Sequence, residues 1–213
     1  MQNNSPSTVT KFFGHFISFV FHPLFVPTYF ILYLIKVVPF EFVGITDWQL
    51  QLRVFSVFWL TAFFPAFAVF LLWRLKFSES IFLRTQKDRI IPYVIVMFFY
   101  WWMYYLSRNF SDQPIVLKYF YFGVFIASAI GLIVNNFIKV SLHGMGIGGM
   151  LASVVLVGLK YPINNIIWDI AILFIAGIVI SARMMVSDHT NKELTIGLGI
   201  GIITQTLAYF WVG

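Results

Sequence analysis

The sequence predicts an all-helical integral membrane protein, a compact bundle of six to seven transmembrane helices that forms a single domain over residues 1–213. Its residues are 60% hydrophobic, 20% aromatic and only 10% charged, whereas soluble domains average about 45–50% apolar and about 25% charged residues. The apolar residues also fall into runs near the roughly 20 residues that a helix needs to cross the hydrocarbon layer. This composition excludes a soluble protein and, because of its large apolar area, a disordered chain.

The charge and the cysteine content limit which kinds of site and which binding partners the protein can have. The formal net charge is +6, and cysteine is absent. A chain without cysteine has no disulfide, thiolate nucleophile, zinc ribbon or iron–sulfur site. In a membrane protein, the excess of cations favours anionic lipid headgroups or a phosphorylated substrate over nucleic acid. We expect no metal ion and no cofactor.

The chain begins with a polar segment, residues 1–12, which we interpret as a short tail because no small-residue cleavage site follows the first apolar run. That run covers about residues 16–38. Residues that interrupt it are His15, His22, Pro23 and Pro27. Proline removes a backbone donor and bends a helix, so we expect a kinked structural helix with satisfied histidines. A broken or re-entrant segment is the alternative.

Six further apolar runs follow in order. They cover about residues 54–73, 90–106, 119–134, 144–159, 166–180 and 194–212. Four aromatic residues close the third run and are typical of the belt at a membrane interface: Trp101, Trp102, Tyr104 and Tyr105. The sequence shows no internal repeat and no linker, which favours one bundle.

Three polar segments separate these runs and hold most of the reactive side chains: residues 84–92, 139–144 and 181–193. Two apolar runs lie between each segment and the next. The chain therefore crosses the membrane twice from one segment to the next, and all three are predicted on the same face. This parity does not depend on whether the first run spans the membrane.

The third segment contains the most specific pattern. His189 and Glu193 are four residues apart, so they share one face if the last helix begins near residues 188–190. A carboxylate there can fix the tautomer of the imidazole and direct its other nitrogen outward as a base or nucleophile. The amides at the start of this helix and the guanidinium of Arg183 suit an anion such as phosphate.

Each of these residues also has a purely structural interpretation. A carboxylate–histidine pair at this spacing is often a surface contact, and arginine near a helix end often extends to lipid headgroups. Lys87 and Arg89 alone are typical of a cytoplasmic loop. His143 alone fits a structural role as well as it fits a catalytic one. Possible helix caps are Ser187, Asp188 and Thr190. Four glycines suit close helix packing better than a phosphate cradle: Gly144, Gly146, Gly148 and Gly149.

Residues 84–193 resemble the type 2 phosphatidic acid phosphatase superfamily of integral membrane lipid phosphatases, whose pattern is KxxxxxxRP, PSGH and SRxxxxxHxxxD. The third motif is matched from Ala182-Arg183 through His189 to Glu193, with Ala in place of Ser and Glu in place of Asp. The second keeps the Ser and His as Ser141 and His143 but loses the Pro and Gly. In the first motif, the proline follows Arg89 only at Pro92. Phe82 stands at the position of the lysine, so Arg84 or Lys87 would have to take the place of that lysine.

The resemblance implies a metal-independent hydrolysis of a phosphomonoester or diphosphate. It implies that His189 attacks phosphorus, that Glu193 orients His189, and that His143 protonates the leaving group and then activates water. Residues that would hold the phosphoryl oxygens are Arg84, Lys87, Arg89, Ser141, Gly144 and Arg183. Dense cations and in-line positioning are what phosphoryl transfer requires.

A lipid substrate is expected because the polar segments lie at a membrane surface, where a phosphate head meets cations while its tail stays among helices. Phosphatidic acid, phosphatidylglycerol phosphate, undecaprenyl diphosphate and phosphorylated lipid A are all compatible. The alternatives are a transporter or a structural membrane subunit, and a phosphatase fold that transfers phosphate between lipids or is inactive. The oligomeric state stays open.

Membrane orientation has two opposing indications. Of the 14 Lys and Arg residues, nine lie on the face of the polar segments and five on the other, which would place the segments in the cytoplasm. Four of the nine are assigned to phosphate: Arg84, Lys87, Arg89 and Arg183. Without them the two faces are equal. The resemblance implies a site that faces away from the cytoplasm, in a multi-pass protein of the cell (inner) membrane, and we follow it.

Overall fold

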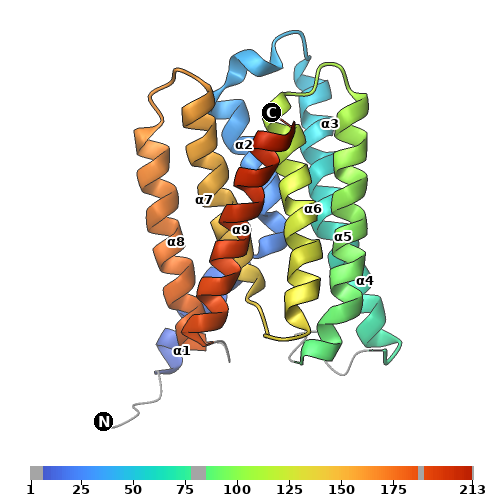
Figure 1. The fold of residues 1–213 in the computed structure, drawn as a ribbon, viewed down its shortest axis with the longest axis vertical. Coiled ribbons are helices and arrows are strands. Elements are labelled where there is room, and N and C mark those ends of the chain that lie inside the picture. The colour runs from blue at the N-terminus through green and yellow to red at the C-terminus, as the bar shows by residue number, and fades with distance from the viewer. Residues whose placement is uncertain (1–6, 78–84, 187–189, 213) are drawn as a thin grey trace.

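The computed structural model describes residues 7–77, 85–186 and 190–212, and in these ranges the chain is an all-helical bundle (Figure 1). Seven segments among the described residues are long and apolar enough to cross a membrane. The predicted fold class is confirmed, and the chain is a multi-pass membrane protein. The described C-terminal helix ends at the opposite end of the bundle from the first helix, as an odd number of crossings requires.

The first membrane segment is broken into separate helices, which corresponds to the alternative above and not to the expected kinked helix. It consists of α1 (Thr8–Val20), a single 3₁₀ turn η1 (Pro23–Phe25) and α2 (Val26–Val37). His22 caps the turn, and Pro23 and Pro27 stand in the first positions of η1 and α2, where a missing N–H costs no helical hydrogen bond. Helix α1 begins earlier than predicted because the hydroxyl of Ser7 accepts a hydrogen bond from the Thr10 amide.

The second segment is also irregular. It contains α3 (Asp47–Phe58), a π-turn η3 (Trp59–Phe63) and α4 (Phe64–Arg74). Pro65 follows the π-turn at the start of α4, where its ring is accommodated. A short 3₁₀ turn, η2 (Pro39–Phe42), connects this segment to the first.

The other five segments are continuous helices. They are α5 (Gln86–Asn109), α6 (Ile115–Asn135), α7 (Leu142–Lys160), α8 (Ile166–Val186) and α9 (Asn191–Val212). Their apolar centres agree with the predicted spans, but α5, α7 and α9 start two to four residues earlier than predicted. The reason is that their first turns are polar and are stabilised by capping side chains at the membrane surface.

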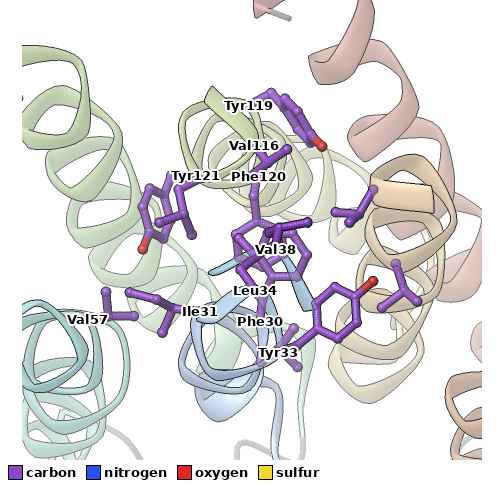
Figure 2. Close-up of a cluster of buried hydrophobic side chains, with 14 of the residues drawn as sticks. Phe30, Ile31, Tyr33, Leu34, Val38, Val57, Val116, Tyr119, Phe120 and Tyr121 are labelled. Carbon is purple, nitrogen blue, oxygen red and sulfur yellow. The ribbon is translucent and has the colours of Figure 1, made fainter. Parts of the chain in front are cut away.

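The main apolar core surrounds α2 in the upper half of the bundle. Phe30, Ile31 and Leu34 are fully buried against the first turns of α6, as Figure 2 shows. The rings of Phe30 and Phe120 stack with their centroids 4.1 Å apart. This packing fixes α2 between α3, α6 and α7 and leaves the lower end of the bundle for polar residues.

Helices α7 and α9 pack backbone to backbone along a seam of glycines. A Cβ at Gly148 would lie 2.3 Å from the Leu198 carbonyl oxygen, and one at Gly201 would lie 2.2 Å from that of Met145. Only glycine allows helices to approach this closely. The predicted packing role of the glycines in α7 is thus confirmed for Gly148, and the seam sets the two helix starts side by side.

Candidate functional site

The polar segments predicted to share one face do meet at one end of the bundle. The starts of α5, α7 and α9 and the ends of α6 and α8 all lie at the lower end in Figure 1. Two hydrogen bonds join the three stretches directly. Arg89 Nη1 donates to the Val140 carbonyl at 2.8 Å, and the Ser141 amide donates to the Glu193 carbonyl at 3.3 Å. The part of the site that the structure describes is therefore a bonded cluster.

Arg89 is the buried cation of this cluster. Its exposed fraction is only 7%, although it lies in the first turn of α5. The Thr85–Asp88 capping box begins that turn and so orients Arg89 toward the start of α7. The guanidinium also lies within electrostatic range of the Glu193 carboxylate. Lys87, on the same turn, is exposed.

A reciprocal pair of hydrogen bonds fixes α5 to the end of α6. Gln86 Nε2 donates to the Asn135 carbonyl at 2.8 Å, and Asn135 Nδ2 donates to the Gln86 carbonyl at 2.9 Å. Asn135 is fully buried, and its Oδ1 has no hydrogen-bond partner among the described residues. This pair holds the helix turn that carries Arg89.

Ser141 and Gly144 form the start of α7. Ser141 Oγ accepts the Gly144 amide at 3.3 Å as the N-cap, and Ser141 is fully buried. Gly144 packs against α9, where a Cβ would lie 2.7 Å from the Leu194 carbonyl oxygen. Both residues thus have structural roles that account for their identity, and their contact with phosphate stays a prediction.

His143 is held by the broken first segment. Its Nε2 lies 2.9 Å from the carbonyl oxygen of Ser18 in α1. A carbonyl oxygen only accepts hydrogen bonds, so Nε2 must carry the proton. When the ring is neutral, Nδ1 is therefore the nitrogen with the lone pair.

His22 is a second imidazole at this position. Its ring lies edge to face against that of His143, with the centroids 5.3 Å apart. Its Nδ1 accepts the Leu24 amide at 3.4 Å, which assigns the remaining proton to Nε2 in the neutral ring. Arg183, at the end of α8, is close enough for its charge to act on His22.

Glu193 begins α9 in a capping box with Thr190. Glu193 Oε2 accepts the Thr190 amide at 3.0 Å, and Thr190 Oγ1 accepts the Glu193 amide at 3.3 Å. The capping role expected of Thr190 is confirmed, and Glu193 shares it. The predicted nucleophile His189 and the predicted phosphate ligand Arg84 lie outside the described residues.

The structure thus brings six predicted site residues into one cluster: Arg89, Ser141, His143, Gly144, Arg183 and Glu193. It adds Ser18, His22, Gln86 and Asn135, to which sequence reasoning had assigned no part in the site. The only sequence feature that pointed to any of these four residues was the His22-Pro23 break. A histidine where a helix is interrupted can contact residues of other helices. No protein-family model, curated protein or solved structure matches this chain.

Proposed function

We propose that this protein is a membrane lipid phosphatase that hydrolyses a phosphomonoester or diphosphate of a lipid. The observation that carries the proposal is the bonded convergence of three distant stretches, through Arg89–Val140 and Ser141–Glu193, at one end of a membrane bundle. Each stretch supplies one part of the phosphatase-like pattern: a guanidinium, an imidazole, and the arginine–carboxylate pair that brackets His189.

The proposed reaction has two steps. His189 attacks phosphorus, so that a nitrogen–phosphorus bond forms while the bond to the lipid oxygen breaks, and protonated His143 gives its proton to that oxygen. Neutral His143 then takes a proton from water, whose oxygen bonds to phosphorus while the nitrogen–phosphorus bond to His189 breaks. Inorganic phosphate is released and His189 is restored. Because Ser18 holds Nε2–H, the proton would travel through Nδ1.

The cations support the transition state rather than the ground state alone. Arg89 and Arg183 present forked donors that match phosphoryl oxygens, and part of the cluster is buried, where such interactions are strong. Arg84 and Lys87 are proposed as further phosphate ligands. Glu193 is proposed to orient His189 while it caps α9.

The position of the cluster at the end of the seven described membrane segments supports a lipid substrate. At this end of the bundle, the cluster can contact the phosphorylated headgroup of a lipid while the chains of the lipid stay in the hydrocarbon layer. We propose that the site faces away from the cytoplasm in the cell (inner) membrane.

A transporter is the second candidate, and one observation favours it. The first two segments are interrupted along their length, by η1 and by the π-turn η3, and broken helices are typical of transporter binding sites. Against this, Asp169 lies near the opposite end of the bundle, where Asn165 donates a hydrogen bond to it, so it is not a midplane ion ligand.

Phosphate release from a panel of phosphorylated lipids in detergent, with chelator present, tests the proposal. We expect the wild-type protein to release phosphate from at least one lipid. We expect His189→Ala to lose the activity completely and His143→Gln to lose about 10²-fold or more. Equal rates for wild type and His189→Ala would remove the hydrolase and favour the transporter.

A further inference from the structure

We propose that the groove between α1 and α8 binds a hydrocarbon chain of the lipid whose phosphorylated head the polar cluster holds. This inference rests on the proposed function and specifies how its substrate lies. The groove has a volume of about 830 Å³, within the range of sites that hold small ligands. Its walls are almost entirely apolar and include Phe13, Gly14 and Ile17 from α1 and Leu173, Gly177 and Ala182 from α8.

The shape of the groove comes from two glycines with opposite surroundings. At Gly14 the helices touch, since a Cβ there would lie 2.4 Å from a methyl carbon of Val186. At Gly177, higher on α8, a Cβ would meet nothing within 4 Å. The helices therefore meet at the lower end of the bundle and leave open space above it, facing the hydrocarbon layer.

On both walls of the groove, a lining residue is the chain neighbour of a residue of the polar cluster. On α8, the lining residue Ala182 precedes Arg183. On α1, the lining residue Ile17 precedes Ser18, whose carbonyl oxygen accepts from His143. A lipid with its phosphate between Arg183 and His143 would therefore have an apolar surface for its chain close by, and this proximity is why we assign the groove to a chain of that lipid.

A substitution that fills the groove tests the inference without disturbing the helix contacts. Gly177→Phe places a ring in the groove, where the structure has open space. Gly199→Phe is the matched control, because a Cβ at Gly199 also meets nothing within 4 Å but lies on α9 and does not line the groove. Gly177 is nine residues before Val186, and Gly199 is eight residues after Asn191, so the two are at similar depths.

The first readout compares a long-chain phosphatidic acid with its dihexanoyl analogue. We expect Gly177→Phe to raise KM for the long-chain lipid by about tenfold or more, since apolar contacts of a few carbons discriminate by this amount. We expect kcat/KM for the dihexanoyl lipid to stay unchanged, and Gly199→Phe to behave as wild type on both. Unchanged kinetics of Gly177→Phe on the long-chain lipid, or an equal loss on both substrates, overturns the inference.

The second readout separates the groove from the proposed hydrolysis. A phosphatidic acid with a photoactivatable chain is crosslinked to the protein in detergent, and the labelled peptides are mapped. We expect labels on α1 and α8 that unlabelled phosphatidic acid removes and phosphatidylcholine does not, and that Gly177→Phe abolishes. If no phosphate is released but this labelling is found, the groove stands and the hydrolase fails. Labelling that phosphatidylcholine removes equally well shows ordinary bilayer lipid, and the inference then fails.

Discussion

At the scale of single residues, the imidazole of His143 has a defined tautomer because its Nε2 faces the Ser18 carbonyl oxygen. We expect neutral His143 to carry its proton on Nε2 and its lone pair on Nδ1, the nitrogen that we propose transfers the proton. Nitrogen-15 NMR of histidine-labelled protein measures this, and loss of one signal set in His143→Gln assigns it. A neutral ring protonated on Nδ1 would contradict the proposed path of the proton.

Glu193 combines a structural and a proposed chemical role, and the two can be separated. Gln is accepted in a capping box, so Glu193→Gln keeps the bond to the Thr190 amide and should change stability by less than about 0.5 kcal/mol. If the negative charge supports His189, phosphate release falls by about 10²-fold. Thermal unfolding and phosphate release measured on the same samples give both quantities.

Thr190→Ala is the control for Glu193→Gln, because it removes the hydroxyl of the cap but leaves the carboxylate. We expect it to cost about 1 kcal/mol of stability and to retain most of the activity. Full activity in Glu193→Gln would show that this carboxylate is only a helix cap.

At the scale of elements, the glycine seam between α7 and α9 positions His143 relative to the start of α9. Gly148→Ala places a methyl group 2.3 Å from the Leu198 carbonyl oxygen, so the helices must separate at a cost of about 1–3 kcal/mol. Thermal unfolding in detergent should show a lower midpoint. Gly199→Ala, with open space at its Cβ, should be neutral or stabilised by up to about 1 kcal/mol. Equal stability of the two variants would mean that the seam is looser than described.

The ends of the helices were the weakest part of the sequence prediction, for a physical reason. Hydropathy identifies the apolar centre of a span, but polar first turns such as Thr85–Asp88 and Thr190–Glu193 belong to the helix through their caps. These turns carry Arg89 and Glu193. The apolar runs alone therefore placed Arg89 and Glu193 outside the spans, whereas the structure places both in the first turns of helices.

At the scale of the whole molecule, the sequence predicted the number of spans and the shared face of the three polar segments, because both follow from counting apolar runs. The sequence did not predict that Ser18 and His22 lie beside these polar segments. Their contacts with His143 depend on how the broken first segment packs, and no local pattern relates residues 125 positions apart. The contribution of the N-terminal third is thus a property of the tertiary fold.

The central claim is that this convergence serves phosphoryl transfer through a histidine. The most direct measurement is to quench the protein during reaction with a phosphatidic acid labelled with ³²P in its phosphate and to look for covalent label. We expect wild type to carry acid-labile, alkali-stable label on the peptide that contains His189, and His189→Ala to carry none. Phosphate release without any covalent label, or the same label in His189→Ala, would contradict the account.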